Sequence, residues 1–173
     1  MERYQVERLF YEGWRISAYL CTDKGTGQKV VVRKYSKEDS HSKNYVQREL
    51  TALKIIDHPN VIRCIDSFED ENFHYIVTEY IEGCSLYEVL NSYPLNEMAA
   101  LRILHQILSA LVEIHKKNII HKDIKPSNIL LDAEGNVKIN DFGISYLLEF
   151  EGDFSTTMAY TQSYGAPELF AVG

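Results

Sequence analysis

The stretch from Ile119 to Gly143 constrains the fold and the chemistry of this chain more than any other segment. It reads IIHKDIKPSNILLDAEGNVKINDFG and places Asp123, Lys125, Asn128 and Asp141 between short apolar runs. A carboxylate can accept a proton from an attacking hydroxyl, and a second carboxylate and an amide oxygen can hold Mg²⁺. A lysine can neutralise charge that develops on a transferred phosphoryl group. Any one of these residues alone would be unremarkable, so their occurrence together and in this order is the informative feature.

Composition excludes several other classes of protein. The chain has 173 residues, 45% of them hydrophobic and 25% charged, which is typical of a globular protein with a core. Its net charge of −7 argues against a nucleic-acid partner that depends on overall positive charge. No apolar run is long enough to span a membrane, and the start, MERYQVERLF, lacks a signal segment, so we expect a cytoplasmic protein. Cys21, Cys64 and Cys84 lack metal-ligand spacing and are expected to be free thiols.

The first half of the chain is predicted to be rich in strands. Short runs of β-branched and aromatic residues alternate with turn residues, and one amphipathic segment predicts a helix that ends before Pro59. That helix carries Val46, Leu50, Leu53 and Ile56 on one face. The predicted elements are strands at Ala18–Cys21, Val30–Val32 and Tyr75–Thr78, a hairpin turn at Asp23–Gly27 and the helix at Tyr45–Ile56.

The second half is predicted to be mainly helical. A short helix at Ser85–Leu90 precedes a long one at Glu97–Lys117, with Asn96 as its N-cap. Small strands are expected at Asn128–Leu131 and Val137–Ile139, joined by a turn at Glu134–Asn136. The order of elements predicts an α+β fold of two lobes with a connector near Glu79–Gly83. The apolar stripe expected to face the core of the long helix consists of Leu101, Leu104, Leu108, Leu111 and Ile114.

In this order and spacing, the motifs resemble those of the eukaryotic-type protein kinases, over essentially the whole chain. His121-Lys122-Asp123 stands where the family has His-Arg-Asp, and Asn128 follows five residues after Asp123. Asp141-Phe142-Gly143 matches the metal motif, and Ala166-Pro167-Glu168 closes the activation segment. The resemblance implies a two-lobed protein-kinase-like fold. Residues 1–80 would form a strand-rich ATP-binding lobe with one main helix, and residues 81–173 a partial, mainly helical catalytic lobe.

The resemblance also implies a role for each matching residue. Asp123 would orient the substrate hydroxyl and accept its proton. Lys125 would contact the γ-phosphate of ATP, and a lysine at this position is typical of serine/threonine kinases. Asn128 and Asp141 would hold Mg²⁺. His121 and Phe142 would pack in a hydrophobic column between the lobes. The residues expected at the ATP site are Gly13 in the phosphate loop, Arg33 and Glu49 as an ion pair, Thr78 as gatekeeper, Glu79 to Ile81 as hinge, and Ala18, Val31 and Leu130 around the adenine ring.

Two departures from the family pattern concern the ATP end. The family's glycine-rich loop aligns with Tyr11 to Ala18, YEGWRISA, in which only Gly13 survives. The strand lysine of the family aligns with Arg33, and a slip of one residue would supply Lys34 instead. Because such a slip turns a side chain to the other face of the strand, Arg33 is the favoured alignment. Arginine keeps the charge, but its planar head differs from an ammonium group at a tight phosphate site.

The activation segment raises a question of regulation. The resemblance implies that the cation of Lys122, beside Asp123, is offset by an anion, which phosphorylation of Ser155, Thr156 or Thr157 would supply. Unmodified loop residues are the alternative. Thr161 matches the threonine that faces the catalytic aspartate in the family. The chain ends five residues after Glu168, where the family continues into further helices. We therefore expect either a fragment or exposed apolar surface on the second lobe.

Three functions are compatible with these motifs. The first is a protein serine/threonine kinase that uses ATP and Mg²⁺, phosphorylates an unidentified protein and answers to a possible regulatory partner, with little activity in these 173 residues alone. The second is a pseudokinase that acts as a nucleotide- or protein-binding scaffold, favoured by the eroded loop and Arg33. The third is a kinase-like regulatory module of a larger signalling protein, because HKDI, PSNIL and DFGIS are similar to such modules in multidomain bacterial sensors.

Overall fold

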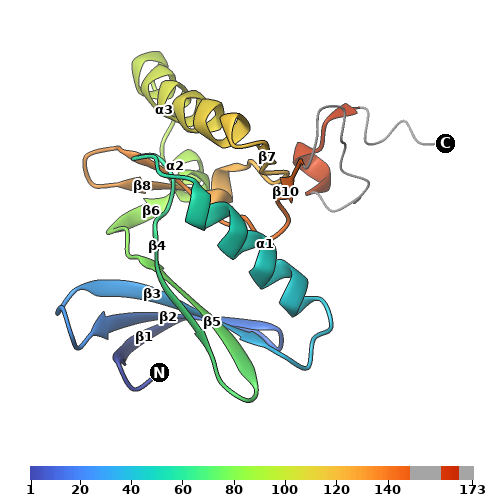
Figure 1. The fold of residues 1–173 in the computed structure, drawn as a ribbon. Helices are drawn as coiled ribbons and strands as arrows, with labels where there is room; N and C mark the ends of the chain where they lie inside the picture. Colours follow the sequence, from blue (N-terminus) through green and yellow to red (C-terminus); the bar gives the residue numbers. More distant parts are fainter. Residues whose placement is uncertain (149–160, 168–173) are drawn as a thin grey trace.

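The computed structural model describes residues 1–148 and 161–167, and residues 149–160 and 168–173 lie outside the description. Its first part is a sheet of five antiparallel strands in the order β1-β2-β3-β5-β4, with helix α1 alongside (Figure 1). The arrangement agrees with the predicted strand-rich part with one main helix. The bounds are β1 Tyr4–Glu12, β2 Ile16–Asp23, β3 Lys29–Ser36, α1 Ser42–Ile55, β4 Cys64–Glu69 and β5 Phe73–Glu79.

The three strands predicted in this part are confirmed and are longer than their apolar runs. The β2–β3 turn also forms at the predicted residues. The Asp23 carboxylate accepts hydrogen bonds from the Gly25 N–H (2.9 Å) and the Thr26 hydroxyl (3.1 Å). Gly27 has a φ of 73°, a left-handed conformation that glycine adopts without a steric cost. The turn fixes the register between β2 and β3, and this register determines the position of Arg33 on β3.

Strands β1 and β4 were not predicted individually. In β1 only Tyr4 is buried, and the β1–β2 register shifts twice, between Val6 and Arg8 and between Leu9 and Tyr11. An edge strand that is exposed along most of its length has no need of a regular apolar alternation. Local sequence pattern therefore could not identify it.

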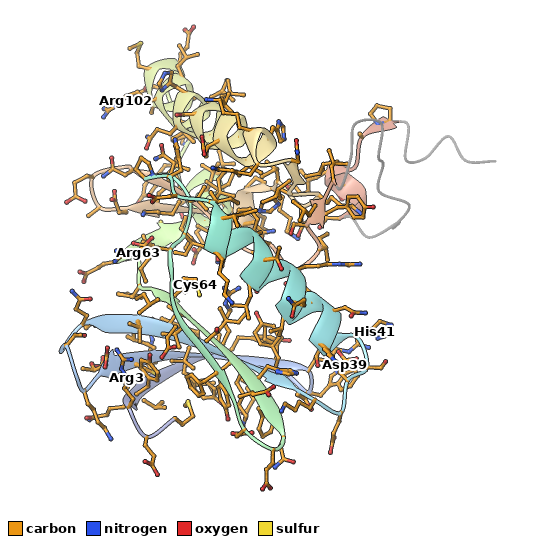
Figure 2. The ribbon with its side chains drawn as sticks, in the orientation of Figure 1. Arg3, Asp39, His41, Arg63, Cys64 and Arg102 are labelled. Carbon is orange, nitrogen blue, oxygen red and sulfur yellow. The ribbon has the colours of Figure 1, made fainter. Side chains whose placement is uncertain are left out.

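Helix α1 begins three residues earlier than predicted, at Ser42, and ends at Ile55. Asp39 and His41 lie at its start (Figure 2), where the Asp39 carboxylate accepts a hydrogen bond from the His41 N–H (3.2 Å). Its buried face includes Val46, Leu53 and the acidic Glu49. A buried carboxylate on an apolar face needs a partner, which β3 supplies.

Among its described residues, the second part of the chain contains two α-helices and two small sheets, with strand orders β6-β8-β9 and β10-β7. The predicted N-cap is confirmed, because the Asn96 side chain accepts a hydrogen bond from the Ala99 N–H (2.8 Å). Ser85 and Glu88 form a capping box at the start of α2. The bounds are β6 Gly83–Ser85, α2 Leu86–Ser92, α3 Glu97–Lys116, β7 Ile119–Ile120, η1 Pro126–Asn128, β8 Ile129–Asp132, β9 Val137–Ile139, β10 Tyr146–Leu147 and η2 Gln162–Tyr164.

The prediction of which face of α3 packs against the core is wrong in part. Leu101, Leu104 and Leu108 are 51%, 48% and 52% exposed, whereas Ile114 is buried as expected. The helix is apolar on two faces, so helical periodicity cannot decide which one packs inward. The buried residues of α3 are Ile103, Ile107, Ala110 and Ile114.

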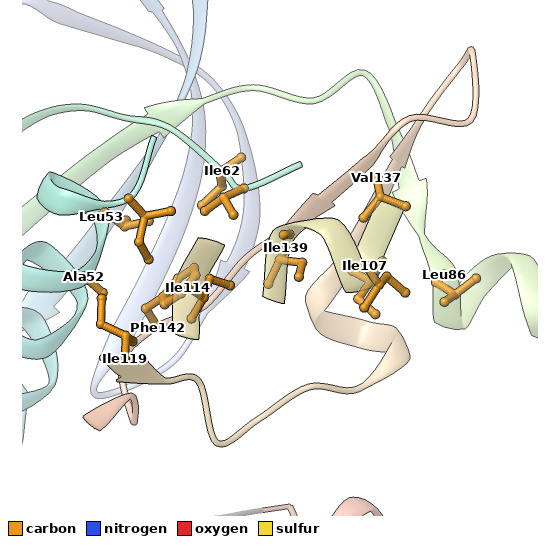
Figure 3. Packing of buried hydrophobic residues seen from close by; sticks show 14 of the residues in the cluster. Ala52, Leu53, Ile62, Leu86, Ile107, Ile114, Ile119, Val137, Ile139 and Phe142 are labelled. Atoms are coloured by element: carbon orange, nitrogen blue, oxygen red, sulfur yellow. The ribbon is translucent and has the colours of Figure 1, made fainter. Parts of the chain in front are cut away.

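The largest hydrophobic cluster joins α1 to the second part of the chain (Figure 3). It includes Leu53 and Ile62 from the first 80 residues and Ile114, Ile139 and Phe142 from the rest. The strand β9 is also tied to the first part by backbone bonds, since the Ile62 N–H donates to the Ile139 carbonyl (2.9 Å). This packing sets the segment before Asp141 against the end of α1. Among the residues that the structure describes, no helix is both long and apolar enough to cross a bilayer.

Candidate active site

His121 anchors the loop that follows β7. It is buried, and its ring lies 4.5 Å from the Phe142 ring between centroids. The Asp123 N–H donates to His121 Nδ1 (3.2 Å), so Nε2 carries the hydrogen and donates to the Asn140 carbonyl (3.1 Å). Burial lowers the pKa of His121, which keeps the ring neutral at pH 7. The neutral ring thus links the Asp123 loop to the Asp141 segment.

Asp123 lies at the centre of a polar cluster. Its Oδ2 accepts a hydrogen bond from Asn128 Nδ2 (2.8 Å) and lies 2.7 Å from Lys125 Nζ. Its Oδ1 accepts a hydrogen bond from the Thr161 hydroxyl (2.5 Å), and Lys125 Nζ donates to that same hydroxyl (2.8 Å). Burial alone would raise the pKa of Asp123, but the bonds from Lys125, Thr161 and Asn128 outweigh it and hold the pKa below its usual value. The carboxylate is therefore ionised at neutral pH and within reach of a hydroxyl donor.

Asp141 lies in a strained segment that is tied to Asn128. It has a φ of 66°, a left-handed conformation uncommon outside glycine. The adjacent Asn140 N–H donates to the Asn128 carbonyl (2.9 Å), which connects the two candidate metal-binding segments. Lys122, with a φ of 71°, is strained in the same way. Such conformations persist where the surrounding structure holds them, and they are common at functional sites.

The chemistry of Asn128 and Asp141 fits Mg²⁺. Both bonds that Asn128 Nδ2 donates go to Asp123, to its carbonyl (2.9 Å) and to Oδ2, which leaves the Asn128 amide oxygen as a ligand. Asp141 adds a carboxylate, and hard oxygen ligands are those that Mg²⁺ prefers. Within residues 1–148 and 161–167, no group of three or more His, Cys, Asp or Glu could hold a metal. A Mg²⁺ site of one carboxylate and one amide is of the kind that substrate phosphates and water complete.

The structure places Arg33, and not Lys34, against Glu49. Arg33 Nη2 lies 2.6 Å from Glu49 Oε1, with the two side chains 10% and 0% exposed, and the Tyr35 hydroxyl donates to Glu49 Oε2 (3.0 Å). Lys34 Nζ lies 3.7 Å from the centroid of the Phe73 ring. Burial opposes the charge of Arg33, but the Glu49 carboxylate more than offsets it and holds the pKa of Arg33 above its usual value. The short contact between the two buried side chains is that of an ion pair, although burial raises the pKa of Glu49.

The residues expected around adenine come from four strands and the segment after β5. Val31 on β3 is paired with Thr78 on β5, and Thr78 is buried. The Glu79 N–H donates to the Arg63 carbonyl (3.0 Å), so this N–H is already engaged within the protein. The half-buried members of the set are Ala18 on β2, Val31 on β3, Glu79 at the end of β5, Ile81 between β5 and β6, and Leu130 on β8.

The candidate phosphate loop is a tight turn between β1 and β2. The Gly13 N–H donates to the Ile16 carbonyl (2.9 Å), which closes the turn. Tyr11 and Trp14 are exposed, and Trp14 is 74% exposed. A methyl group on Gly13 would lie 2.7 Å from the Tyr11 hydroxyl oxygen, so the tyrosine packs over this glycine. The large side chain of Tyr11 therefore occupies a position where the family pattern has glycine.

One group of predicted residues lies outside the described part of the chain, and one residue of the candidate site was not predicted. Ser155, Thr156, Thr157 and Glu168 lie outside the described residues. Tyr45, which sequence reasoning missed, donates a hydrogen bond from its hydroxyl to Asp141 Oδ1. The available signal was its position four residues before Glu49, which places both side chains on one face of α1.

Comparison with known proteins agrees with this geometry. A model of the protein kinase domain matches residues 4–172. The serine/threonine-protein kinase PrkC of Bacillus subtilis (strain 168) is 36% identical over 165 residues, covering 93% of this chain and 25% of that protein. CBL-interacting protein kinase 32 of Oryza sativa subsp. japonica is 33% identical over 174 residues, covering 96% and 40%. Calcium-dependent protein kinase 4 of Plasmodium berghei (strain Anka) is 32% identical over 176 residues, covering 97% and 33%.

The chain spans between 25% and 40% of the length of these curated relatives. The match to the family model covers nearly the whole chain and includes the Asp123 loop, the Asp141 segment and the Arg33–Glu49 pair. The chain belongs to the protein kinase domain family.

Proposed function

We propose that this chain forms the ATP-binding and phosphoryl-transfer part of a protein serine/threonine kinase. Asp123 orients the hydroxyl of a protein serine or threonine and accepts its proton, and Lys125 neutralises charge on the γ-phosphate of ATP. Asn128 and Asp141 hold Mg²⁺, which neutralises charge on the ATP phosphates. The ATP-binding set is Gly13, Ala18, Val31, Arg33, Glu49, Thr78, Glu79, Ile81 and Leu130.

The observation that carries the proposal is the contact of a threonine hydroxyl with the candidate catalytic pair. Thr161 Oγ1 lies 2.5 Å from Asp123 Oδ1 and 2.8 Å from Lys125 Nζ. A carboxylate and an ammonium that converge on one aliphatic hydroxyl form an arrangement that can orient a hydroxyl nucleophile beside a developing negative charge. This supports transfer to serine or threonine.

Partners and location follow from the same proposal. The substrates are ATP and an unidentified protein, and the protein takes part in signalling in the cytoplasm, where cysteines such as the three free ones of this chain stay reduced. Phosphate on Ser155, Thr156 or Thr157 would offset the charge of Lys122. A regulatory partner or an upstream kinase would control that modification.

Phosphate transfer from ATP labelled in its γ-phosphate to a generic protein substrate tests the proposal in the full-length protein. Asp123→Asn should reduce transfer at least about 100-fold while leaving ATP affinity within about twofold, because it removes a group that acts on the hydroxyl. Asp57→Asn, an exposed aspartate near the end of α1, is the matched control and should retain wild-type activity. Equal transfer by wild type and Asp123→Asn would overturn the proposal.

A pseudokinase is the second candidate, and the altered ATP end favours it. Tyr11 and Ile16 occupy glycine positions, and Arg33 replaces the strand lysine. Thermal shift with ATP and Mg²⁺ separates the two functions, because a well-folded full-length protein that binds no nucleotide cannot transfer phosphate. Arg33→Lys should raise ATP affinity if Arg33 occupies the lysine position. Unchanged affinity in that variant, with binding abolished by Lys34→Ala, would reverse the assignment.

A further inference from the structure

Tyr45 on α1 makes a side-chain contact with the candidate metal segment. Its hydroxyl donates a hydrogen bond to Asp141 Oδ1, from a position 96 residues away in sequence. Its ring lies against Gly143, where an added methyl group would collide with the Tyr45 ring. Tyr45 therefore touches the Asp141-Phe142-Gly143 segment at both of its ends.

The hydroxyl bond determines which oxygen of Asp141 is open to a metal. Oδ1 accepts from Tyr45 and also from the Gly143 N–H at 3.3 Å. A carboxylate oxygen has about two in-plane lone-pair sites, so these two donors occupy Oδ1. A metal ion can use Oδ2 without displacing either donor.

Tyr45 is itself held in place from the β3 side. Its ring packs against the Tyr35 ring, with centroids 5.7 Å apart, and the Tyr35 hydroxyl donates to Glu49 Oε2. Glu49 in turn pairs with Arg33. The two tyrosines thus connect the buried ion pair to Asp141 through packed rings and hydrogen bonds.

We propose that Tyr45 is a positioning residue that fixes the Asp141 carboxylate for Mg²⁺. Its hydroxyl holds Oδ1 so that Oδ2 faces the metal, and this contact couples the position of α1 to metal binding. The inference rests on the proposed metal role of Asp141. Groups that hydrogen-bond to a metal ligand orient it, and their removal typically lowers metal affinity about 10- to 100-fold.

Tyr45→Phe tests this inference because it removes the hydroxyl and keeps the ring on Gly143. The affinity for a fluorescent, non-hydrolysable ATP analogue should be measured in EDTA and at increasing Mg²⁺ concentrations. The expected result is an unchanged affinity in EDTA and an Mg²⁺ concentration for half-maximal effect raised about tenfold. Tyr75→Phe is the matched control, since its hydroxyl also donates to a carboxylate, that of Asp70 (2.7 Å), away from the site. It should behave as wild type.

A second measurement needs no variant. Hydrogen exchange of the α1 amides in the wild-type chain should slow when Mg²⁺ is added to the analogue-bound protein, because the metal fixes Asp141 and, through Tyr45, the helix. Unchanged exchange, an unchanged Mg²⁺ requirement in Tyr45→Phe, or tighter Mg²⁺ binding in that variant would each overturn the inference. Wild-type binding that does not depend on Mg²⁺ would instead overturn the metal role of Asp141, and the inference with it.

Discussion

The buried Arg33–Glu49 pair makes a quantitative prediction for Arg33→Met. The variant leaves the Glu49 carboxylate, which is 0% exposed, without its cation. Removing one partner of a buried ion pair costs about 3–5 kcal/mol. The Tyr35 hydroxyl still donates to Glu49, so we expect the lower end, about 3 kcal/mol. For a chain of this size, that corresponds to a fall in the melting temperature of about 6–12 °C.

Urea and thermal unfolding at pH 7 measure this effect. Lys34→Met is the matched control, because Lys34 lies over the Phe73 ring and its loss should cost less than about 1 kcal/mol. The double variant Arg33→Met/Glu49→Gln should be more stable than Arg33→Met, since it leaves no uncompensated charge buried. A loss below about 1 kcal/mol in Arg33→Met, or an equal loss in Lys34→Met, would refute the buried ion pair and the register of β3.

Three further predictions concern the second part of the chain. Asn96→Ala removes the N-cap of α3 and should cost about 1 kcal/mol in urea unfolding, whereas an unchanged midpoint would contradict the cap. Ile107→Ala should lower the free energy of unfolding by about 2–5 kcal/mol, and Leu108→Ala, on the exposed face, by less than about 1 kcal/mol. The reverse order would mean that the leucine face packs inward, as the sequence predicted. Burial lowers the pKa of His121, so below about pH 6.5 the unfolded chain takes up a proton that the folded chain does not, and stability falls. His121→Phe should therefore show a shallower fall in melting temperature between about pH 6.5 and 5, and an equally steep fall would contradict a neutral, buried His121.

Local signals predicted much of the fold. The Asp23–Gly27 turn and the Asn96 cap depend on residues within a few positions of one another, so their chemistry is visible in the sequence. The inward face of α3 depends on what packs against it. Its apolar side chains cover two adjoining faces, one with Leu101, Leu104 and Leu108 and one with Ile103 and Ile107, which left the choice open. The exposed strand β1 lacked the apolar alternation that identifies a half-buried strand.

Some features of the candidate site could likewise be predicted from the sequence, and others could not. The spacing of Asp123, Asn128 and Asp141 indicated the candidate site residues, and the alternation of side chains along β3 predicted that Arg33 would face Glu49. The contact of Tyr45 with Asp141 joins residues 96 positions apart. It depends on how α1 lies against the segment, which no local pattern determines.

The most direct test of the central claim is a structure of the chain with a non-hydrolysable ATP analogue and Mg²⁺. We predict Mg²⁺ at about 2.1 Å from the Asn128 amide oxygen and from Asp141 Oδ2, with the γ-phosphate beside Lys125. We also predict that Asp123 remains free of the metal, with its carboxylate directed at the place of a substrate hydroxyl. A bound nucleotide whose metal touches neither Asn128 nor Asp141 would contradict the proposed Mg²⁺ site.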